Sequence, residues 1–334
     1  MLSPAAACGQ ASTSAPAASA PPPRKLDAAA LAPAIAHAAA LPQLRSLIVA
    51  QDGAVLAERV FRGPGLDAPV NIKSASKTLI ATLAGIALDK GVLSGLDQPV
   101  APILGRRVPA AADPRVRDIT VEHLLSMAAG LESTSGRNYG TWVSSKDWVR
   151  YVLTRPFVAQ PGGPMIYSTG SSHLMSAVLT AASGKSTLQL AREWLGAPLG
   201  FAVPAWTRDP QGVYFGGNEM ALSPRALLAF GEMHRKGGVH AGRQVVSKAF
   251  ATDAFVSRGG RSPYNGYTYG LGWWLRDAGA HRVNFAWGYG GQMVYVVPSL
   301  NLTAVFTSDP NVRGVDGHVQ ALHRLFNTAI VGAG

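Results

Sequence analysis

The stretch NIKSASKTLIATLAGIALDKG, residues 71–91, decides the fold of this chain because it places a serine and a lysine at the start of an apolar helix. Leucine and isoleucine recur there at helical spacing, which predicts a buried helix that ends at Gly91. Ser74 falls in the first turn of this helix. Unpaired backbone N–H groups and the positive end of the helix dipole favour negative charge at that position. The stretch therefore predicts a helix whose N-terminal end carries chemistry.

Ser74 and Lys77 form an S-x-x-K pair on this predicted helix. Residues three apart are neighbours on a helix, so both side chains face the same way. In a partly dry site the pKa of a lysine falls, and the neutral amine can take the serine proton. The structural alternative is that Ser74 only caps the helix while Lys77 extends to water. The pair alone is a hypothesis, and its sequence context decides between the two interpretations.

Composition and charge narrow the classes of protein. The chain has 334 residues, of which 47% are hydrophobic and 15% are charged. These values are typical of a globular chain that can bury a core. The net charge of +11 comes from basic residues spread along the chain, so we expect a solvated basic surface and no binding of nucleic acid. No apolar run reaches the length of a membrane span, so the body is expected to be soluble.

The first residues have a composition of their own. Residues 1–25 are rich in Ala, Ser and Pro, which predicts a disordered leader or tether. Cys8 is the single cysteine, which excludes an internal disulfide and a zinc site made of several cysteines. Small residues before Cys8 are similar to a bacterial lipoprotein processing site, although the apolar core of a signal peptide is missing. We therefore expect an exported protein, periplasmic or lipid-anchored through Cys8; the alternative is a disordered tail on a cytoplasmic protein.

Residues 26–334 are predicted to form one domain. The expected helices and strands alternate in a defined order: a helix over 26–40, a hairpin over 46–61 that turns at Asp-Gly, helices capped by Thr120, Ser145 and Ser223, a helix over 171–182, strands over 267–276, 282–287, 292–297 and 302–307, and a helix over 315–331. Strands at both ends predict an α/β fold of the α+β kind. Its antiparallel sheet is built from the N- and C-terminal segments and flanked by helices, with a mostly helical lobe over about 93–215 inserted.

Two further stretches complete a pattern with S-x-x-K. They are PGGPMIYSTGSSHLMSAVL at 161–179, which contains Tyr167, and AWGYGGQMVYVVP at 286–298. In this order the three stretches resemble the serine β-lactamase and penicillin-binding-protein family. The likeness is greatest to its class C β-lactamase-related esterase and 6-aminohexanoate-oligomer hydrolase branch, and it runs over about 41–331. The resemblance implies a β-lactamase/transpeptidase-like fold and a serine hydrolase.

The resemblance also implies residue roles. Ser74 would be the nucleophile of an acyl-serine intermediate, and either Lys77 or Tyr167 would be the general base. The oxyanion would be held by the N–H of Ser74 and by one within a residue or two of Gln292. The remaining predicted substrate-binding residues are Gly291, Thr169, Trp287 and Tyr289. Structural alternatives remain: a buried aromatic role for Tyr167 and a tight strand entry for the glycines.

Two departures from the family pattern bear on the substrate. Thr169 stands where the branch has asparagine, and Trp287-Gly288-Tyr289 replaces the K-T-G or H-x-G motif. The chain therefore lacks the cation that attracts a substrate carboxylate in β-lactamases and transpeptidases. We expect a small-molecule carboxylic ester or linear amide as substrate. The alternatives are β-lactamase or D-alanyl-D-alanine carboxypeptidase activity on cell-wall peptides, and a non-catalytic relative that binds a ligand.

Other chemistries find little support in the sequence. The eight histidines are scattered and no H-E-x-x-H occurs, so neither a metal nor a cofactor is expected. Gly184-Lys185-Ser186 lacks the first glycine of a phosphate-binding loop, and no G-x-S-x-G elbow is present. His173, on the helix after Tyr167, is interpreted as a structural histidine, with a place along the cleft as the alternative.

Overall fold

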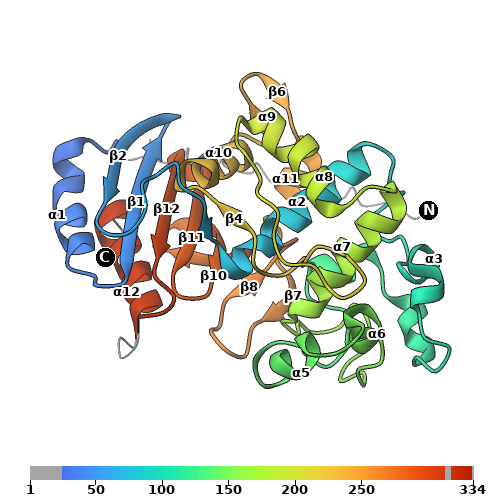
Figure 1. Cartoon of the computed structure of the whole chain (residues 1–334). Helices are drawn as coiled ribbons and strands as arrows, with labels where there is room; N and C mark the ends of the chain where they lie inside the picture. Colours follow the sequence, from blue (N-terminus) through green and yellow to red (C-terminus); the bar gives the residue numbers. More distant parts are fainter. Residues whose placement is uncertain (1–24, 313–316, 333–334) are drawn as a thin grey trace, which may run out of the picture.

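The computed structural model of the chain describes residues 25–312 and 317–332 (Figure 1). Figure 1 shows two regions, an antiparallel sheet with α1 and α12 against it and a group of helices that includes α3, α5, α6 and α7. The prediction for Cys8 falls outside the described residues, as does the start of the helix predicted over 315–331. Within the described part, no helix is long and apolar enough to cross a membrane.

The main sheet has eight strands, and every neighbouring pair in it is antiparallel. In spatial order the strands are β2 (Ala54–Val60), β1 (Leu44–Gln51), β12 (Leu302–Ser308), β11 (Gln292–Val297), β10 (His281–Gly288), β9 (Trp274–Ala278), β8 (Thr268–Tyr269) and β7 (Arg258–Arg261). Two small pairs stand apart: β3 (Val70–Asn71) with β4 (Ala221–Leu222), and β5 (Val239–His240) with β6 (Arg243–Gln244).

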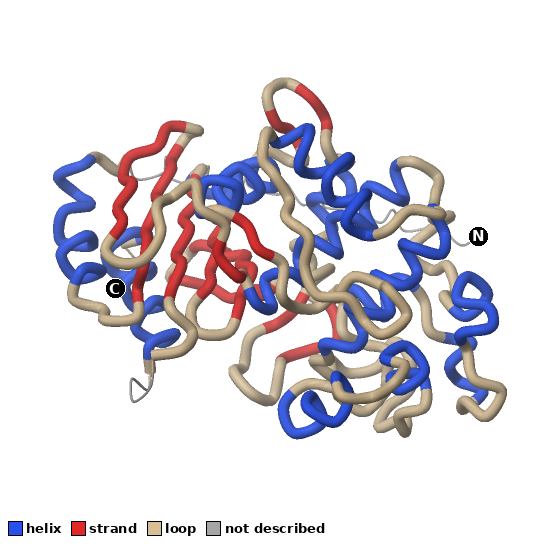
Figure 2. The backbone as a smooth tube through the Cα atoms, in the orientation of Figure 1, coloured by secondary structure: helices blue, strands red, loops and turns tan. Residues whose placement is uncertain are grey.

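The sheet joins the two ends of the described chain. Leu47 of β1 is paired with Phe306 of β12, and β2 lies on the outer side of β1. The β1–β2 turn uses Asp52 and Gly53 at φ 54° and 84°, the positive angles that an Asp-Gly hairpin turn requires. Figure 2 shows most of the strands in one part of the molecule and the small β5–β6 pair apart from them at the top, and the predicted fold class is confirmed.

Helices pack on both faces of the sheet and form the lobe beside it. They are α1 (Ala28–Ala39), α2 (Ser76–Asp89), α3 (Ala101–Leu104), α4 (Val121–Leu125), α5 (Tyr139–Val143), α6 (Trp148–Leu153), α7 (Thr169–Ser183), α8 (Thr187–Ala191), α9 (Ala197–Leu199), α10 (Pro224–Arg235), α11 (Lys248–Asp253) and α12 (His318–Leu325). Thr120 and Ser223 cap α4 and α10 as predicted. The helix expected after Ser145 begins instead at Trp148, because the carboxylate of Asp147 accepts a hydrogen bond from the N–H of Arg150.

Two apolar layers hold the sheet from opposite sides. Successive side chains of a strand point to opposite faces. In β12, Val305 accordingly belongs to the layer under α2 and α10, whereas Phe306 belongs to the layer under α1 and α12. The first layer continues without a break into the helical lobe. The sheet and the lobe therefore share one core, which keeps α2 fixed between them.

The strand predicted over 267–276 is broken in the structure. β8 ends at Tyr269 and β9 starts at Trp274, and the two pair with each other as a hairpin. Gly272 lies in this turn at φ 79°, and a Cβ on it would overlap with Ala81 of α2. A single long strand was the wrong prediction because the glycine allows a reversal that brings the chain against α2.

Candidate active site

The turn that carries Ser74 precedes the helix proper. Lys73, Ser74 and Ala75 form a 3₁₀ turn, and α2 begins at Ser76. Lys73 has φ 51°, a left-handed conformation that is uncommon for a residue with a side chain. Its backbone N–H donates to Asn71 Oδ1 at 2.9 Å, and its carbonyl oxygen accepts from Ser76 Oγ at 2.6 Å. The residue before the predicted nucleophile is thus held in a strained conformation by hydrogen bonds on both sides.

Lys77 is buried beside this turn, with only 2% of its surface exposed. Its Nζ donates to Ser74 Oγ at 2.9 Å and to the carbonyl oxygen of Gly217 at 2.6 Å. No carboxylate of the described chain forms an ion pair with it. Burial without a counter-charge lowers the pKa of Lys77 to about 7. The amine therefore changes its protonation state near neutral pH, at a position 2.9 Å from the serine hydroxyl oxygen.

Tyr167 reaches the same point from the turn before α7. Its ring stacks on Trp274 at 5.2 Å between centroids, and Lys77 Nζ lies 5.1 Å from the centre of the tyrosine ring. Burial raises the pKa of Tyr167 to about 12, although the interaction of the phenol with Ser74 offsets part of the rise. The structure thus brings together the hydroxyl, the amine and the phenol that the sequence analysis selected.

The end of β10 closes the site from the sheet side. Gly288 lies so near the backbone of Ile72 that a Cβ on it would overlap with the Ile72 carbonyl oxygen. Gly290 and Gly291 follow at φ 77° and 97°, and the N–H of Gly291 donates to Gly288 at 3.1 Å. These glycines make a tight turn that presents Tyr289, which is 71% exposed, at the mouth of the site.

Three other predicted residues lie behind the cleft wall. The amide of Gln292 is bound to both backbone groups of Ser308, at 2.7 and 3.2 Å. A Cβ on Gly291 would meet His318 and Ser308. Thr169 Oγ1 is bonded to Ser135 Oγ at 2.9 Å. None of the three is among the lining residues, so their contact with substrate stays a prediction.

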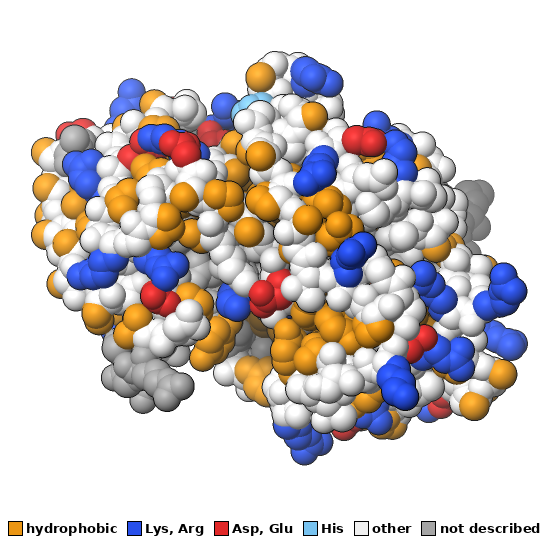
Figure 3. All heavy atoms as spheres, viewed as in Figure 1, with side chains coloured by type: hydrophobic (Ala, Val, Ile, Leu, Met, Phe, Trp, Pro, Cys, Tyr) orange, Lys and Arg blue, Asp and Glu red, His pale blue; other side chains and the backbone are white. Residues whose placement is uncertain are grey.

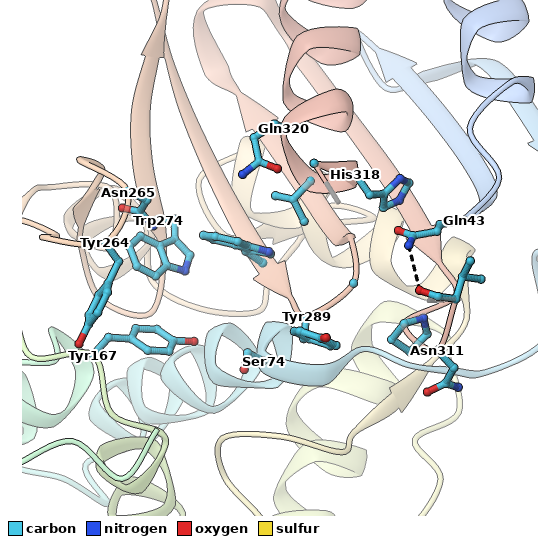
Figure 4. Close-up of a pocket in the computed structure, with 16 residues that line it drawn as sticks. Gln43, Ser74, Tyr167, Tyr264, Asn265, Trp274, Tyr289, Asn311, His318 and Gln320 are labelled. Atoms are coloured by element: carbon cyan, nitrogen blue, oxygen red, sulfur yellow. Dashed lines mark hydrogen bonds between the residues drawn. The ribbon is translucent and has the colours of Figure 1, made fainter. Parts of the chain in front are cut away.

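A cleft of about 960 Å³ opens over Ser74 (Figure 4). In this view Ser74 lies between Tyr167 and Tyr289, with Trp274 near Tyr167 and His318 toward the far end. The described lining contains aromatic, amide and small residues and no Lys, Arg, Asp or Glu: Gln43, Ser74, Tyr167, Tyr264, Asn265, Trp274, Trp287, Tyr289, Gly290, Pro310, Asn311, Val312, Gly317, His318, Val319 and Gln320. The cleft is therefore uncharged along its described wall.

Part of this wall comes from residues that no sequence motif indicates. Tyr264 comes from the hairpin between β7 and β8, and His318 is the first residue of α12. Neither belongs to a motif, and only the folded sheet brings them near Ser74. His173 lies elsewhere, in the core of the lobe, with Nε2 3.0 Å from Asp209 Oδ2. In the described chain no group of three or more His, Cys, Asp or Glu side chains could hold a metal ion.

Comparison with known proteins agrees with this geometry. The family model described as Beta-lactamase matches residues 36–326, most of the chain. The chain belongs to the beta-lactamase family. The predicted relationship is thereby confirmed, and membership supports a serine hydrolase.

Solved structures share the fold of this beta-lactamase-family chain at low identity. "EstCE1, a hydrolase with promiscuous acyltransferase activity" has a TM-score of 0.75 and 20% identity, over 91% of this chain and 99% of that one. A putative 6-aminohexanoate-dimer hydrolase from Bacillus anthracis has 0.70 and 16%, over 87% and 78%. A penicillin-binding protein homolog from Caulobacter crescentus has 0.70 and 17%, over 89% and 97%. At these identities the likeness concerns the fold.

Proposed function

We propose that this protein is a serine hydrolase that cleaves uncharged carboxylic esters or linear amides through an acyl-Ser74 intermediate. One observation carries the proposal: the buried amine of Lys77, which has no carboxylate partner in the described chain, lies 2.9 Å from Ser74 Oγ at the base of the cleft. A lysine whose pKa is lowered toward 7 can accept the proton of a neighbouring serine, which makes the serine oxygen a stronger nucleophile.

The proposed acylation step involves three proton transfers. Neutral Lys77 takes the proton of Ser74 as Oγ attacks the substrate carbonyl carbon and forms a tetrahedral intermediate. The intermediate then collapses, and the bond between the carbonyl carbon and the leaving group breaks. Tyr167 gives its proton to the departing alcohol or amine and regains one from the lysine ammonium. The directions of the two pKa shifts favour these roles, since burial keeps the phenol of Tyr167 protonated and makes the neutral amine of Lys77 easier to form. A water molecule then attacks the acyl carbon by the reverse sequence, which releases the acid and restores Ser74.

The developing oxyanion needs two donors. We assign one to the backbone N–H of Ser74 and the other to that of Tyr289, in place of the region near Gln292. Tyr289 and Ser74 line the same cleft, whereas Gln292 is buried behind it. The close contact of Gly288 with Ile72 supports this assignment, because it brings the strand that precedes Tyr289 against the 3₁₀ turn Lys73–Ala75, the nucleophile turn.

The described wall of the cleft favours a neutral substrate. A substrate carboxylate would find no cation there, and burying an unpaired charge is costly. Aromatic side chains from Tyr264, Trp274 and Trp287 suit an apolar or planar group beside the ester. On the face shown in Figure 3, Lys and Arg side chains are spread over much of the surface, several of them near one another at the right, with Asp and Glu side chains among them. Two proteins of similar fold, the hydrolase EstCE1 with promiscuous acyltransferase activity and the putative 6-aminohexanoate-dimer hydrolase, support acyl-transfer or hydrolase chemistry here.

Covalent labelling tests the proposal. A fluorophosphonate should label Ser74 and stop hydrolysis of p-nitrophenyl butyrate. Ser74→Ala should abolish both, whereas Ser94→Ala, at an exposed serine, should change neither. Hydrolysis that persists in Ser74→Ala would contradict the proposal. Stable acylation by a fluorescent penicillin, or nitrocefin turnover faster than ester turnover, would favour the β-lactam alternative instead.

A further inference from the structure

We propose that Glu219 is a positioning residue that holds Ser74 and Lys77 in their reactive arrangement. This inference rests on the proposed function. Glu219 does not line the cleft and belongs to none of the motifs that suggested the site. It has φ 68°, and Lys73, the residue before the nucleophile, has φ 51°. Lys73 and Glu219 are thus both non-glycine residues in left-handed conformations, and their side chains contact each other next to Ser74.

The carboxylate of Glu219 holds Lys73 in two ways. Its Oε1 lies 3.2 Å from Lys73 Nζ, which fixes the side chain. Its Oε2 accepts from Asn71 Nδ2 at 2.6 Å, and the Oδ1 of the same amide accepts the backbone N–H of Lys73 at 2.9 Å. One carboxylate therefore anchors Lys73 directly by its side chain and, through Asn71, by its backbone.

The segment around Glu219 also holds the base. Gly217, two residues earlier, supplies the carbonyl oxygen that accepts from Lys77 Nζ at 2.6 Å. Met220, the next residue, donates its N–H to Ser76 Oγ at 3.2 Å and accepts from the N–H of Ile72 at 2.9 Å. Residues 217–220 therefore bind the chain on both sides of Ser74, at residues 72–73 before it and 76–77 after it. Glu219 is the point where this segment is tied to Lys73.

Glu219 has its own support on the lobe side. Its backbone N–H donates to Asn218 Oδ1 at 3.0 Å, and Asn218 Nδ2 donates to the hydroxyl of Tyr139 at 2.9 Å. Tyr139 stacks on Phe215 within the lobe. These contacts with the lobe fix the left-handed conformation of Glu219. Its carboxylate is therefore held in a constant position relative to Lys73.

A role in stability alone explains these contacts poorly. The Lys73 and Glu219 side chains are 24% and 30% exposed, and partly exposed ion pairs contribute little to folding. Strained backbone persists only where its surroundings fix it, and such strain gathers at functional sites. Losing the carboxylate should therefore leave the fold intact while the turn with Ser74 relaxes.

A double-mutant cycle tests the inference. Glu219→Gln, Lys73→Met and the double variant should each lower kcat for p-nitrophenyl butyrate about tenfold. The rate of fluorophosphonate labelling should fall in parallel, and KM should stay within about twofold. The double variant should be no worse than Glu219→Gln alone, because the ion pair that Lys73→Met removes is one of the two links that Glu219→Gln disturbs. The pH midpoint of kcat/KM should not move, since Lys77 sets it. Glu193→Gln, which breaks the surface pair with Lys185, is the matched control and should change nothing.

Three outcomes would overturn the inference. One is a Glu219→Gln variant with unchanged kcat and labelling rate. Another is single-variant losses that multiply in the double variant. A third is a loss of activity that only follows a fall in melting temperature. If Glu219→Gln does not fold, Lys73→Met removes the ion pair from its other side, and an unchanged kcat and labelling rate in that variant would equally overturn the role of the pair. Failure of the proposed function would look different, because the wild-type protein itself would then remain unlabelled at Ser74.

Discussion

Gly288 of β10 lies directly against the carbonyl oxygen of Ile72, two residues before Ser74, with no room for a side-chain carbon between them. This contact joins the C-terminal part of the sheet to the start of α2. The site thus has two halves that meet at a glycine. One half supplies Ser74 and Lys77, and the other supplies the strand end and Tyr289.

Gly288→Ala should push these halves apart. We expect a loss of about a hundredfold in kcat/KM for p-nitrophenyl butyrate, because small displacements of catalytic groups are costly. Steady-state kinetics with near-UV circular dichroism would measure the effect in folded protein. Gly65→Ala, at a glycine with no atom near the added carbon and no positive φ, should retain activity. Equal activity in both variants would show that the contact is not needed.

The pKa of Lys77 predicts the pH dependence of acylation. The amine is active when neutral, so kcat/KM should rise with pH up to about 7 and level off above it. Lys77→Met should lose about a thousandfold and show no such rise. Lys77→Arg should not recover at pH 9, because a guanidinium stays protonated. A pH profile that keeps its limb near 7 in Lys77→Met would assign the limb to another group.

Substrate charge should matter at Trp287. An ester with a free carboxylate near the scissile bond should have a higher KM than its neutral isostere, because no described lining residue is cationic. Trp287→Lys adds a cation at the end of β10 and should narrow the difference by about fivefold. Trp287→Met is the control, since it removes the indole without adding charge. Paired KM measurements on the two esters decide the matter. If the difference in KM between the two esters became smaller in both variants, the cause would be the space opened by removing the indole and not the added charge.

Buried histidines predict loss of stability in acid. Burial lowers the pKa of His234 to about 3, of His318 to about 4 and of His323 to about 3. Below pH 6.5 the unfolded chain binds protons that these folded residues do not, so the free energy of unfolding falls as pH falls. His234→Phe should reduce that slope by about 1.4 kcal/mol per pH unit between pH 6 and 4. Urea unfolding across this range measures it.

The acid-stability measurement needs a control variant and a substitution at His234 that preserves packing. His37→Gln, at an exposed histidine of α1, should keep the wild-type slope. His234 packs against Phe230 and Trp273, so the phenylalanine variant preserves an aromatic ring in that place. A His234→Phe protein with the wild-type slope would mean that acid unfolding is governed by other groups.

Local rules predicted much of this molecule. The spacing of Ser74 and Lys77 follows from helix geometry, and the two side chains are bonded in the structure. Thr120 caps α4 as predicted from short-range preferences, and its own N–H donates in return to His123 Nδ1. The strand predicted over 292–297 has the bounds of β11, since its apolar run ends at a proline. In each case the deciding interaction lies within a few residues along the chain.

Long-range contacts account for what the sequence could not predict. Glu219 meets Lys73 from 146 positions away, and nothing near it in sequence indicates a left-handed conformation. Tyr264 and His318 reach the cleft only because β7, β8 and α12 are placed by the completed sheet. The reversal at Gly272 depends on α2, against which that glycine packs. Such features come from tertiary packing, which overrides local pattern.

The pairing of β1 with β12 has a consequence for how a ribosome delivers this protein. Ser46 and Thr307 bond side chain to side chain although 261 positions separate them, so β1 emerges long before its central partner is translated. Contacts of such separation form slowly and leave apolar strand surface open meanwhile. Ser74 and Lys77 therefore leave the ribosome early, whereas the sheet beside their site is complete only after β12 has been released. Chaperones that bind the chain during synthesis should therefore bind mainly to the β1–β2 hairpin.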